Sequence, residues 1–136
     1  MFIEKILYKK QLYALIVRSK EQFKKKGINF VTNEKDFLQV GFLKHNKNHH
    51  IKAHSHKKRN LKITFMSECL LIKKGELNVI FYDNKGKDIK KNKILKKNDI
   101  ILLIKGGHGF KVNKNSEIIE IKQGPYIKVN DKTLFE

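Results

Sequence analysis

The pattern that most constrains the fold of this chain is a series of short runs in which hydrophobic residues alternate with other residues. Residues 61–66 place Leu61, Ile63 and Phe65 on one face of an extended strand, and residues 11–18 are apolar on both faces. Only residues 19–26 are suited to a short helical turn. The other predicted strands are residues 1–8, 38–43, 68–73, 76–82, 88–95, 99–104, 110–112 and 116–122. Such short strands predict an all-β sandwich or barrel.

Turn-forming residues separate several of these strands. Lys74 and Gly75 predict a tight bend between residues 68–73 and 76–82. Residues 83–86 predict a hairpin turn, in which Gly86 is free to adopt a positive φ. No repeat or linker interrupts the chain, so we expect one domain over residues 1–136.

Length and composition fit that single domain. A chain of 136 residues with 40% apolar content buries a real core, roughly 68% of the surface that its unfolded form exposes. The one cysteine, Cys69, excludes an internal disulfide and points to a reducing cytoplasm. The longest apolar runs, residues 12–17 and 100–104, are far shorter than the ~20 residues of a membrane span.

The net charge of +18 raises the question of nucleic-acid binding. Of the 31 basic residues, only Arg18 and Arg59 are arginines, and the lysines are spread along the whole chain. Nucleic-acid sites rely on arginine for bidentate contacts. The pattern therefore favours a solvated basic surface, which attracts small anions, over a nucleic-acid interface.

Five of the six histidines crowd into residues 45–56. On a strand, His54 and His56 point to the same face, and two such imidazoles form half of a transition-metal site. His108 lies in a glycine-rich turn that is able to aim a third imidazole at the same space. His45, His49 and His50 lie in a polar turn and are expected to be solvent-exposed.

The surroundings of these histidines resemble the cupin superfamily of small antiparallel β-barrels. Its first motif is an HxH pair, a glutamate, six residues and a glycine, which here are His54, His56, Glu68 and Gly75. Its second motif is an apolar strand that leads to a turn and a histidine, here residues 98–108. Eleven residues separate His56 from Glu68, more than the superfamily usually has. The chain is most similar to small cupins of bacterial surface-polysaccharide clusters, which share residues 106–110 and 122–126.

This resemblance implies a jelly-roll barrel over residues 38–126, preceded by extra N-terminal strands in residues 1–37. It also implies one divalent transition metal (iron, manganese, nickel or zinc) held by His54, His56, Glu68 and His108. The alternative is a metal-free pocket lined by the same residues. Around that pocket we expect Arg59, three residues after His56, to anchor an anionic ligand. The alternative is that Arg59, which follows two lysines, is simply solvated. The resemblance adds Gln123 and Tyr126 to the pocket border.

Three classes of function remain open at this point. The first, which we expect, is a metal-assisted isomerase, epimerase or lyase of surface-polysaccharide biosynthesis that acts on an anionic carbohydrate, a sugar nucleotide or sugar phosphate. The second is an iron-dependent dioxygenase, and the third is a binding module without catalysis. No pair of residues identifies a catalytic acid and base, and Cys69 is expected to be a packed or surface thiol. Residues 1–8 and 11–18, apolar on both faces, are able to extend a sheet or to pack between subunits, and we expect a homodimer.

Overall fold

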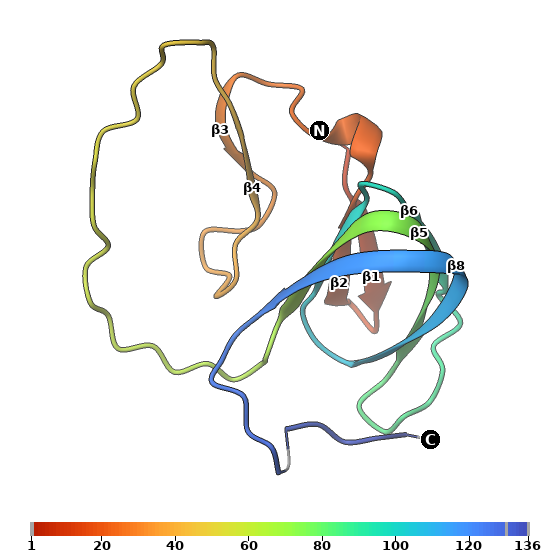
Figure 1. Ribbon diagram of the computed structural model, residues 1–136. Coiled ribbons are helices and arrows are strands. Elements are labelled where there is room, and N and C mark those ends of the chain that lie inside the picture. Colours follow the sequence, from red (N-terminus) through yellow and green to blue (C-terminus); the bar gives the residue numbers. More distant parts are fainter. Residues whose placement is uncertain (1, 130, 136) are drawn as a thin grey trace.

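The regular structure of the chain is almost entirely β, as predicted (Figure 1). The computed structural model describes residues 2–129 and 131–135. The strands are β1 (Glu4–Tyr8), β2 (Gln11–Val17), β3 (Gly27–Phe30), β4 (Gly41–Lys44), β5 (Glu68–Tyr82), β6 (Lys93–Lys96), β7 (Ile100–Leu103) and β8 (Gly107–Lys122). A single 3₁₀ turn, η1 (Ser19–Glu21), falls within the predicted helical turn. No helix in the described part of the chain has the length and apolar character needed to cross a membrane.

Six strands form one antiparallel sheet, and β3 and β4 form a separate pair. The order in the large sheet is β1-β2-β7-β5-β6, and β8 also pairs with β5. The N-terminal strands extend this sheet, because β2 pairs with β7 between Ala14 and Val17. This is the first of the two arrangements that their apolar faces predicted.

The long strand β5 is curled, as its pairing with β7 and β8 shows. Leu103, at the end of β7, lies opposite Glu68, while Gly107, at the start of β8, lies opposite Tyr82. The four residue steps from Leu103 to Gly107 reach at most about 14 Å. A straight strand would separate Glu68 from Tyr82 by about 46 Å. The two ends of β5 must therefore bend toward each other, and Figure 1 shows β5 and β8 curving together.

The curl is concentrated where the sequence predicted a tight bend between two strands. Lys74 and Gly75 do not end the strand, because β5 continues through them from Glu68 to Tyr82. Instead, the β5–β8 register shifts three times between Ile72 and Leu77, and such bulges bend a ribbon. Gly75 has φ +90°, and a Cβ atom there would overlap the Ser116 side chain and the Asn115 carbonyl. A glycine is required at this bend for both reasons.

The main core fills the inside of the curl. One buried cluster joins residues from both halves of β5 to residues of β1, β2, β6 and β7: Ile6, Tyr13, Ala14, Ile16, Leu70, Ile72, Leu77, Val79, Phe81, Leu95, Ile101 and Leu103. A cluster that touches both halves of a curled strand lies on its concave side. A smaller cluster of Leu15, Cys69 and Leu102 covers the opposite face, where Leu38 and Val40 pack on it.

One predicted strand of the barrel, at residues 61–66, does not form in the described structure. Residues 45–67 contain no strand, although 61–66 alternate as a strand does. Figure 1 shows this segment running away from the sheet as a long loop. Both edges of the first half of β5 are already occupied by β7 and β8, so residues 61–66 have no free edge beside β5 to join. The described strands therefore form an open curled sheet.

Candidate functional site

Two of the predicted site residues meet on the concave face. The Nε2 atom of His108 lies 3.1 Å from Oε2 of Glu68. Glu68 shares the face of Leu70 and is opposite Leu103, and both of these belong to the main core. His108 is opposite Phe81, another residue of that core. The curl thus brings together residues from opposite ends of the β5–β8 ladder.

This pair is half-buried and electrostatically matched. The side chains of His108 and Glu68 are 27% and 25% exposed. The hydrogen bond from His108 lowers the pKa of the Glu68 carboxyl, and this effect outweighs burial, which acts in the opposite direction. The positive charges of Lys122 and Lys132 lower the same pKa further. Glu68 is therefore a carboxylate at neutral pH, able to orient the imidazole of His108.

The HxH pair lies elsewhere. His54 and His56 are exposed residues of the 45–67 loop, and their ring centroids are 5.4 Å apart in an edge-on arrangement. The Nδ1 atom of His54 lies 2.8 Å from the backbone oxygen of Lys52. The strand that was expected to turn both imidazoles to the interior is not formed. The structure therefore gives two separate pairs, His54 with His56 and Glu68 with His108.

Each pair has donor atoms that suit a divalent transition metal, since imidazole and carboxylate groups are its common ligands. No cluster of three or more histidine, cysteine, aspartate or glutamate side chains that could hold a metal occurs within residues 2–129 and 131–135. The concave face alone supplies two of the four expected ligands. The other two reach it only if the 45–67 segment changes its position.

The three residues expected to border the pocket have different surroundings. Gln123 accepts a hydrogen bond at Oε1 from the backbone N–H of Ser67, over 2.9 Å. It therefore fixes the chain immediately before Glu68. Its Nε2 atom is buried and has no hydrogen-bond partner in the described part of the chain. Tyr126 is exposed, with the ammonium of Lys122 5.4 Å from its ring. Arg59 is exposed in the 45–67 loop.

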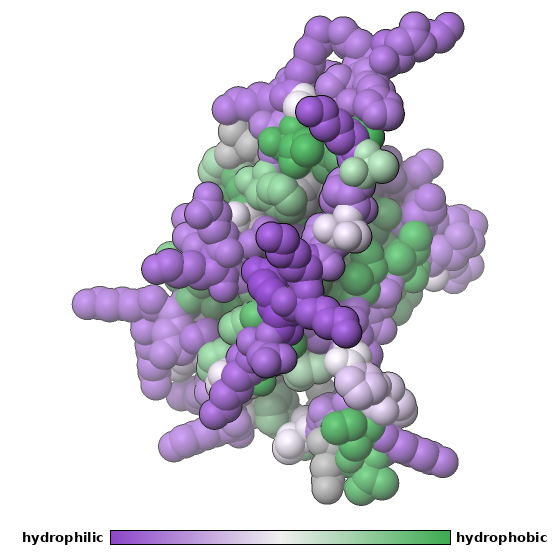
Figure 2. All heavy atoms as spheres, turned by 90° about the vertical axis from the view of Figure 1, so that its left-hand side faces the viewer, coloured by the Kyte–Doolittle hydropathy of each residue, from purple (hydrophilic) through white to green (hydrophobic). Residues whose placement is uncertain are grey.

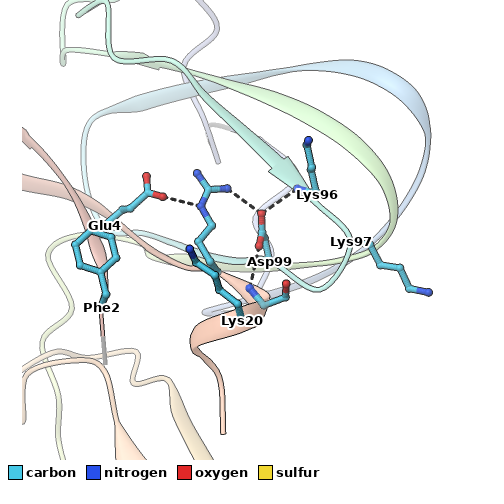
Figure 3. Close-up of a pocket in the computed structure, with 8 residues that line it drawn as sticks. Phe2, Glu4, Lys20, Lys96, Lys97 and Asp99 are labelled. Atoms are coloured by element: carbon cyan, nitrogen blue, oxygen red, sulfur yellow. Dashed lines mark hydrogen bonds and ion pairs between the residues drawn. The ribbon is translucent and has the colours of Figure 1, made fainter. Parts of the chain in front are cut away.

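A second polar site, around Arg18, was not predicted from the sequence. Arg18 donates from Nε to Oε1 of Glu4 over 2.6 Å and from Nη1 to Oδ2 of Asp99 over 2.8 Å. Asp99 also accepts from the backbone N–H of Ser19, and Lys93 pairs with Glu4. Glu4, Arg18, Ser19 and Asp99 line a cavity of about 360 Å³. Figure 3 shows this cavity in close-up. Because the contacts link β1, η1 and the β6–β7 turn, we assign them a structural role.

The remaining candidates take no part in either pair. Cys69 is buried beside Leu15 and Leu102, and burial raises the pKa of its thiol, so the prediction of a packed thiol is confirmed. His45 and His49 stack face to face with ring centroids 4.0 Å apart. That contact is confined to the loop.

Any inference about the function of this chain depends on the arrangement of these residues. The resemblance to cupins depends on the motif residues alone, of which Glu68 and His108 lie together on the concave face. Searches against protein-family models, curated proteins and solved structures found no match to this chain.

Proposed function

We propose that the concave face around Glu68 and His108 binds an anionic carbohydrate and catalyses an isomerase- or epimerase-type proton transfer on it. The observation that carries this proposal is the 3.1 Å approach of His108 Nε2 to Glu68 Oε2 at the rim of the main core. A carboxylate that orients an imidazole is a recurrent arrangement for general acid–base catalysis. We also propose, from the resemblance of the motifs, that the fold is a cupin-type jelly roll.

The chemistry requires a base that removes a proton from the carbon next to a sugar carbonyl. His108 is the proposed base, and it returns the proton to a neighbouring position of the sugar. Glu68 holds the imidazole in place and stabilises the imidazolium that forms during the transfer. The buried Nε2 of Gln123, which lacks a partner in the described residues, is the proposed donor to a sugar hydroxyl.

The charge around the pair supports an anionic substrate. Lys122 and Lys132 act on the Glu68 carboxyl, and the chain as a whole carries +18. A sugar nucleotide or sugar phosphate would be steered to such a surface. Arg59 and Tyr126 are proposed contacts of the substrate. The link to surface-polysaccharide synthesis follows from the resemblance to the small cupins. A cytoplasmic location fits the buried, free thiol of Cys69.

The metal defines a second form of the proposal, in which His108 is a ligand and not the base. His54, His56, Glu68 and His108 would then hold one divalent ion of iron, manganese, nickel or zinc. Because Nε2 of His108 faces Glu68, only Nδ1 is left, and it either takes the proton or binds the ion. When bound, such an ion would supply Lewis-acid chemistry to a sugar carbonyl. The role of the chain is then to bring the HxH pair to the concave face and to hold Glu68 ionised. Elemental analysis is expected to give about one metal per chain.

Proton exchange tests the reaction. Sugar nucleotides and sugar phosphates that carry a carbonyl are incubated with the protein in D₂O, and NMR follows deuterium entry at the carbon next to the carbonyl. We expect exchange that His108→Asn and Glu68→Gln reduce at least about a hundredfold. His49→Asn, in the polar loop, is the matched control and keeps full activity. Exchange at the same rate in His108→Asn, or ligand stabilisation without any exchange, would contradict the proposal.

A further inference from the structure

The strand β8 has one edge without a partner. Residues 107–122 pair with β5 along nearly the whole strand, and in the described part of the chain β8 pairs with no other strand. The second edge therefore presents a row of unpaired backbone N–H and C=O groups. Proteins usually cover or disrupt such an edge, because it recruits any strand of suitable shape.

Apolar side chains lie uncovered along this edge strand. Phe110, Val112 and Ile118 are opposite core residues of β5, so they face the concave side, yet they are 40%, 58% and 40% exposed. Ile119 and Ile121 are exposed on the other face. Single exposed apolar residues are ordinary, but five on one unpaired edge strand mark an interaction surface.

Residues 61–66 alternate as a β-strand does, but they form no strand in the structure. In residues 61–66, the alternating side chains Leu61, Ile63 and Phe65 are all exposed, by 54%, 39% and 50%. The segment belongs to the loop that leaves the sheet in Figure 1, and Figure 2 shows hydrophobic side chains uncovered among polar ones on that side of the molecule. The free edge of β8 and residues 61–66 thus both lack a β-strand partner, and both have apolar side chains to cover.

Two acidic side chains of β8 are available to the basic segment, although β8 also carries Lys111, Lys114 and Lys122 and so has no net negative charge. Residues 45–66 contain six lysines and arginines and no acidic residue. On β8, Glu117 and Glu120 are exposed, and neither forms an ion pair with a described residue. Lys62 and the basic residues before Leu61 provide partners for these two carboxylates.

The position of Ser67 decides whose edge the segment joins. Ser67 bonds to Gln123, and Glu68 sits in the ladder between β7 and β8. To reach the free edge of its own β8, the chain would have to cross two strand spacings, about 10 Å, which takes about three residues. Those residues are 64–66 and include Phe65. The full apolar stripe therefore does not fit on the edge of its own β8.

We propose that residues 61–66 of one copy add as a strand to the free edge of β8 in a second copy, and that the two copies exchange this strand reciprocally. The apolar stripe of the segment then covers the concave-side residues of the partner strand. The exchange also carries His54, His56 and Arg59 to the sheet of the neighbouring copy. Their service at its Glu68–His108 pair rests on the proposed function, but the exchange itself does not.

Light scattering over a range of concentrations tests the exchange without any ligand. We expect a species of twice the 16.0 kDa chain mass. Ile63→Lys, in the segment, and Val112→Lys, on the edge, should each raise the dissociation constant about tenfold or more, because a lysine would be buried unpaired. Ile127→Lys is the matched control, since Ile127 is 60% exposed and lies on neither surface. Added salt should strengthen the dimer by screening the +18 charge of each copy.

Hydrogen exchange of the alternate β8 amides that do not bond to β5 distinguishes the other occupants. We expect these amides to be protected in the wild type and unprotected in Ile63→Lys. A monomer in which these amides are protected would mean that the edge of β8 is covered within one chain. A monomer in which they are unprotected would mean that the edge is uncovered. A dimer that both variants leave intact would place the interface elsewhere. Assembly only after addition of a short DNA duplex would make a polyanion the partner. Each of these four results overturns the proposal.

Discussion

Glu68 and His108 stand forty residues apart in the sequence and at opposite ends of the β5–β8 ladder, yet their side chains are 3.1 Å apart. The whole ladder comprises thirteen pairs, from Glu68↔Lys122 to Tyr82↔Gly107, and His108 belongs to the twelfth, Phe81↔His108. Only a ribbon that curls back on itself can bring these ends together. The candidate site is thus a product of the curl, and a change that opens the ribbon should separate the two groups.

Acid should remove the contribution of Glu68 to stability. Its pKa is lower in the folded chain than in the unfolded chain, so the stabilisation is complete above the unfolded value of about 4.3 and is lost as the pH falls through the folded value. We expect Glu68→Gln to cost about 1 kcal/mol at pH 6 and nothing measurable near pH 2. Denaturant unfolding at a series of pH values measures the difference. Glu117→Gln, at an exposed site on β8, should show no such convergence, and parallel curves for both variants would argue against the ion pair.

The bend at Gly75 should be intolerant of a side chain. Gly75→Ala places a Cβ atom against Ser116 and Asn115 at a φ of +90°. Gly27 has a similar φ of +87°, but nothing lies within 4 Å of the position of its Cβ. Gly27→Ala should therefore cost only the backbone strain of about 1–2 kcal/mol, and Gly75→Ala should cost about 3 kcal/mol or more. Equal losses in thermal unfolding would mean that the close approach at Gly75 is absent.

The two arginines should differ in their effect on stability. Arg18→Ala leaves Asp99, which is 5% exposed, without its guanidinium and should cost about 3 kcal/mol. Arg59→Ala removes an exposed side chain and should stay within about 0.5 kcal/mol of the wild type. Denaturant unfolding at neutral pH compares them. In ligand binding the order should reverse, with Arg59→Ala weakening anionic sugars and Arg18→Ala leaving the affinity of the folded protein unchanged.

Metal content separates the HxH pair from the other loop histidines. The His54→Ala/His56→Ala double variant should hold much less of the expected divalent metal than the wild type. A His45→Ala/His49→Ala double variant is the matched control and should keep its metal. Elemental analysis after metal loading and desalting gives the ratio. Equal, near-zero metal in all three proteins would remove the metal from the account and leave the Glu68–His108 pair to act alone.

Much of the sheet could be predicted, because a strand or a turn depends on residues that are close together in the sequence. The alternation in residues 11–18 predicted β2, and the turn at 83–86 forms with Gly86 at φ +82° and its N–H bonded to Asp83. The bend at Gly75 was placed correctly, but it was interpreted as a turn between two strands instead of a bulge within one strand. A glycine at positive φ suits a bulge as well as a turn.

The site was harder to predict, because it depends on distant residues. The resemblance pointed to both Glu68 and His108, but their direct contact follows from the curl of β5, which no local pattern encodes. The predicted strand at residues 61–66 has the right alternation and no edge to join beside β5. Strand patterns state what a segment can do, whereas pairing depends on which edges remain free.

The central claim, that His108 is part of a ligand site, is tested most directly by NMR of the histidine side chains. Imidazole ¹H–¹⁵N spectra are recorded during titration with a sugar nucleotide or sugar phosphate, and His108→Asn assigns the His108 signals. We predict that the His108 ring signals shift and saturate with the ligand, and that Glu68→Gln removes the response. His108 signals that stay unchanged while the ligand saturates the protein would contradict the account.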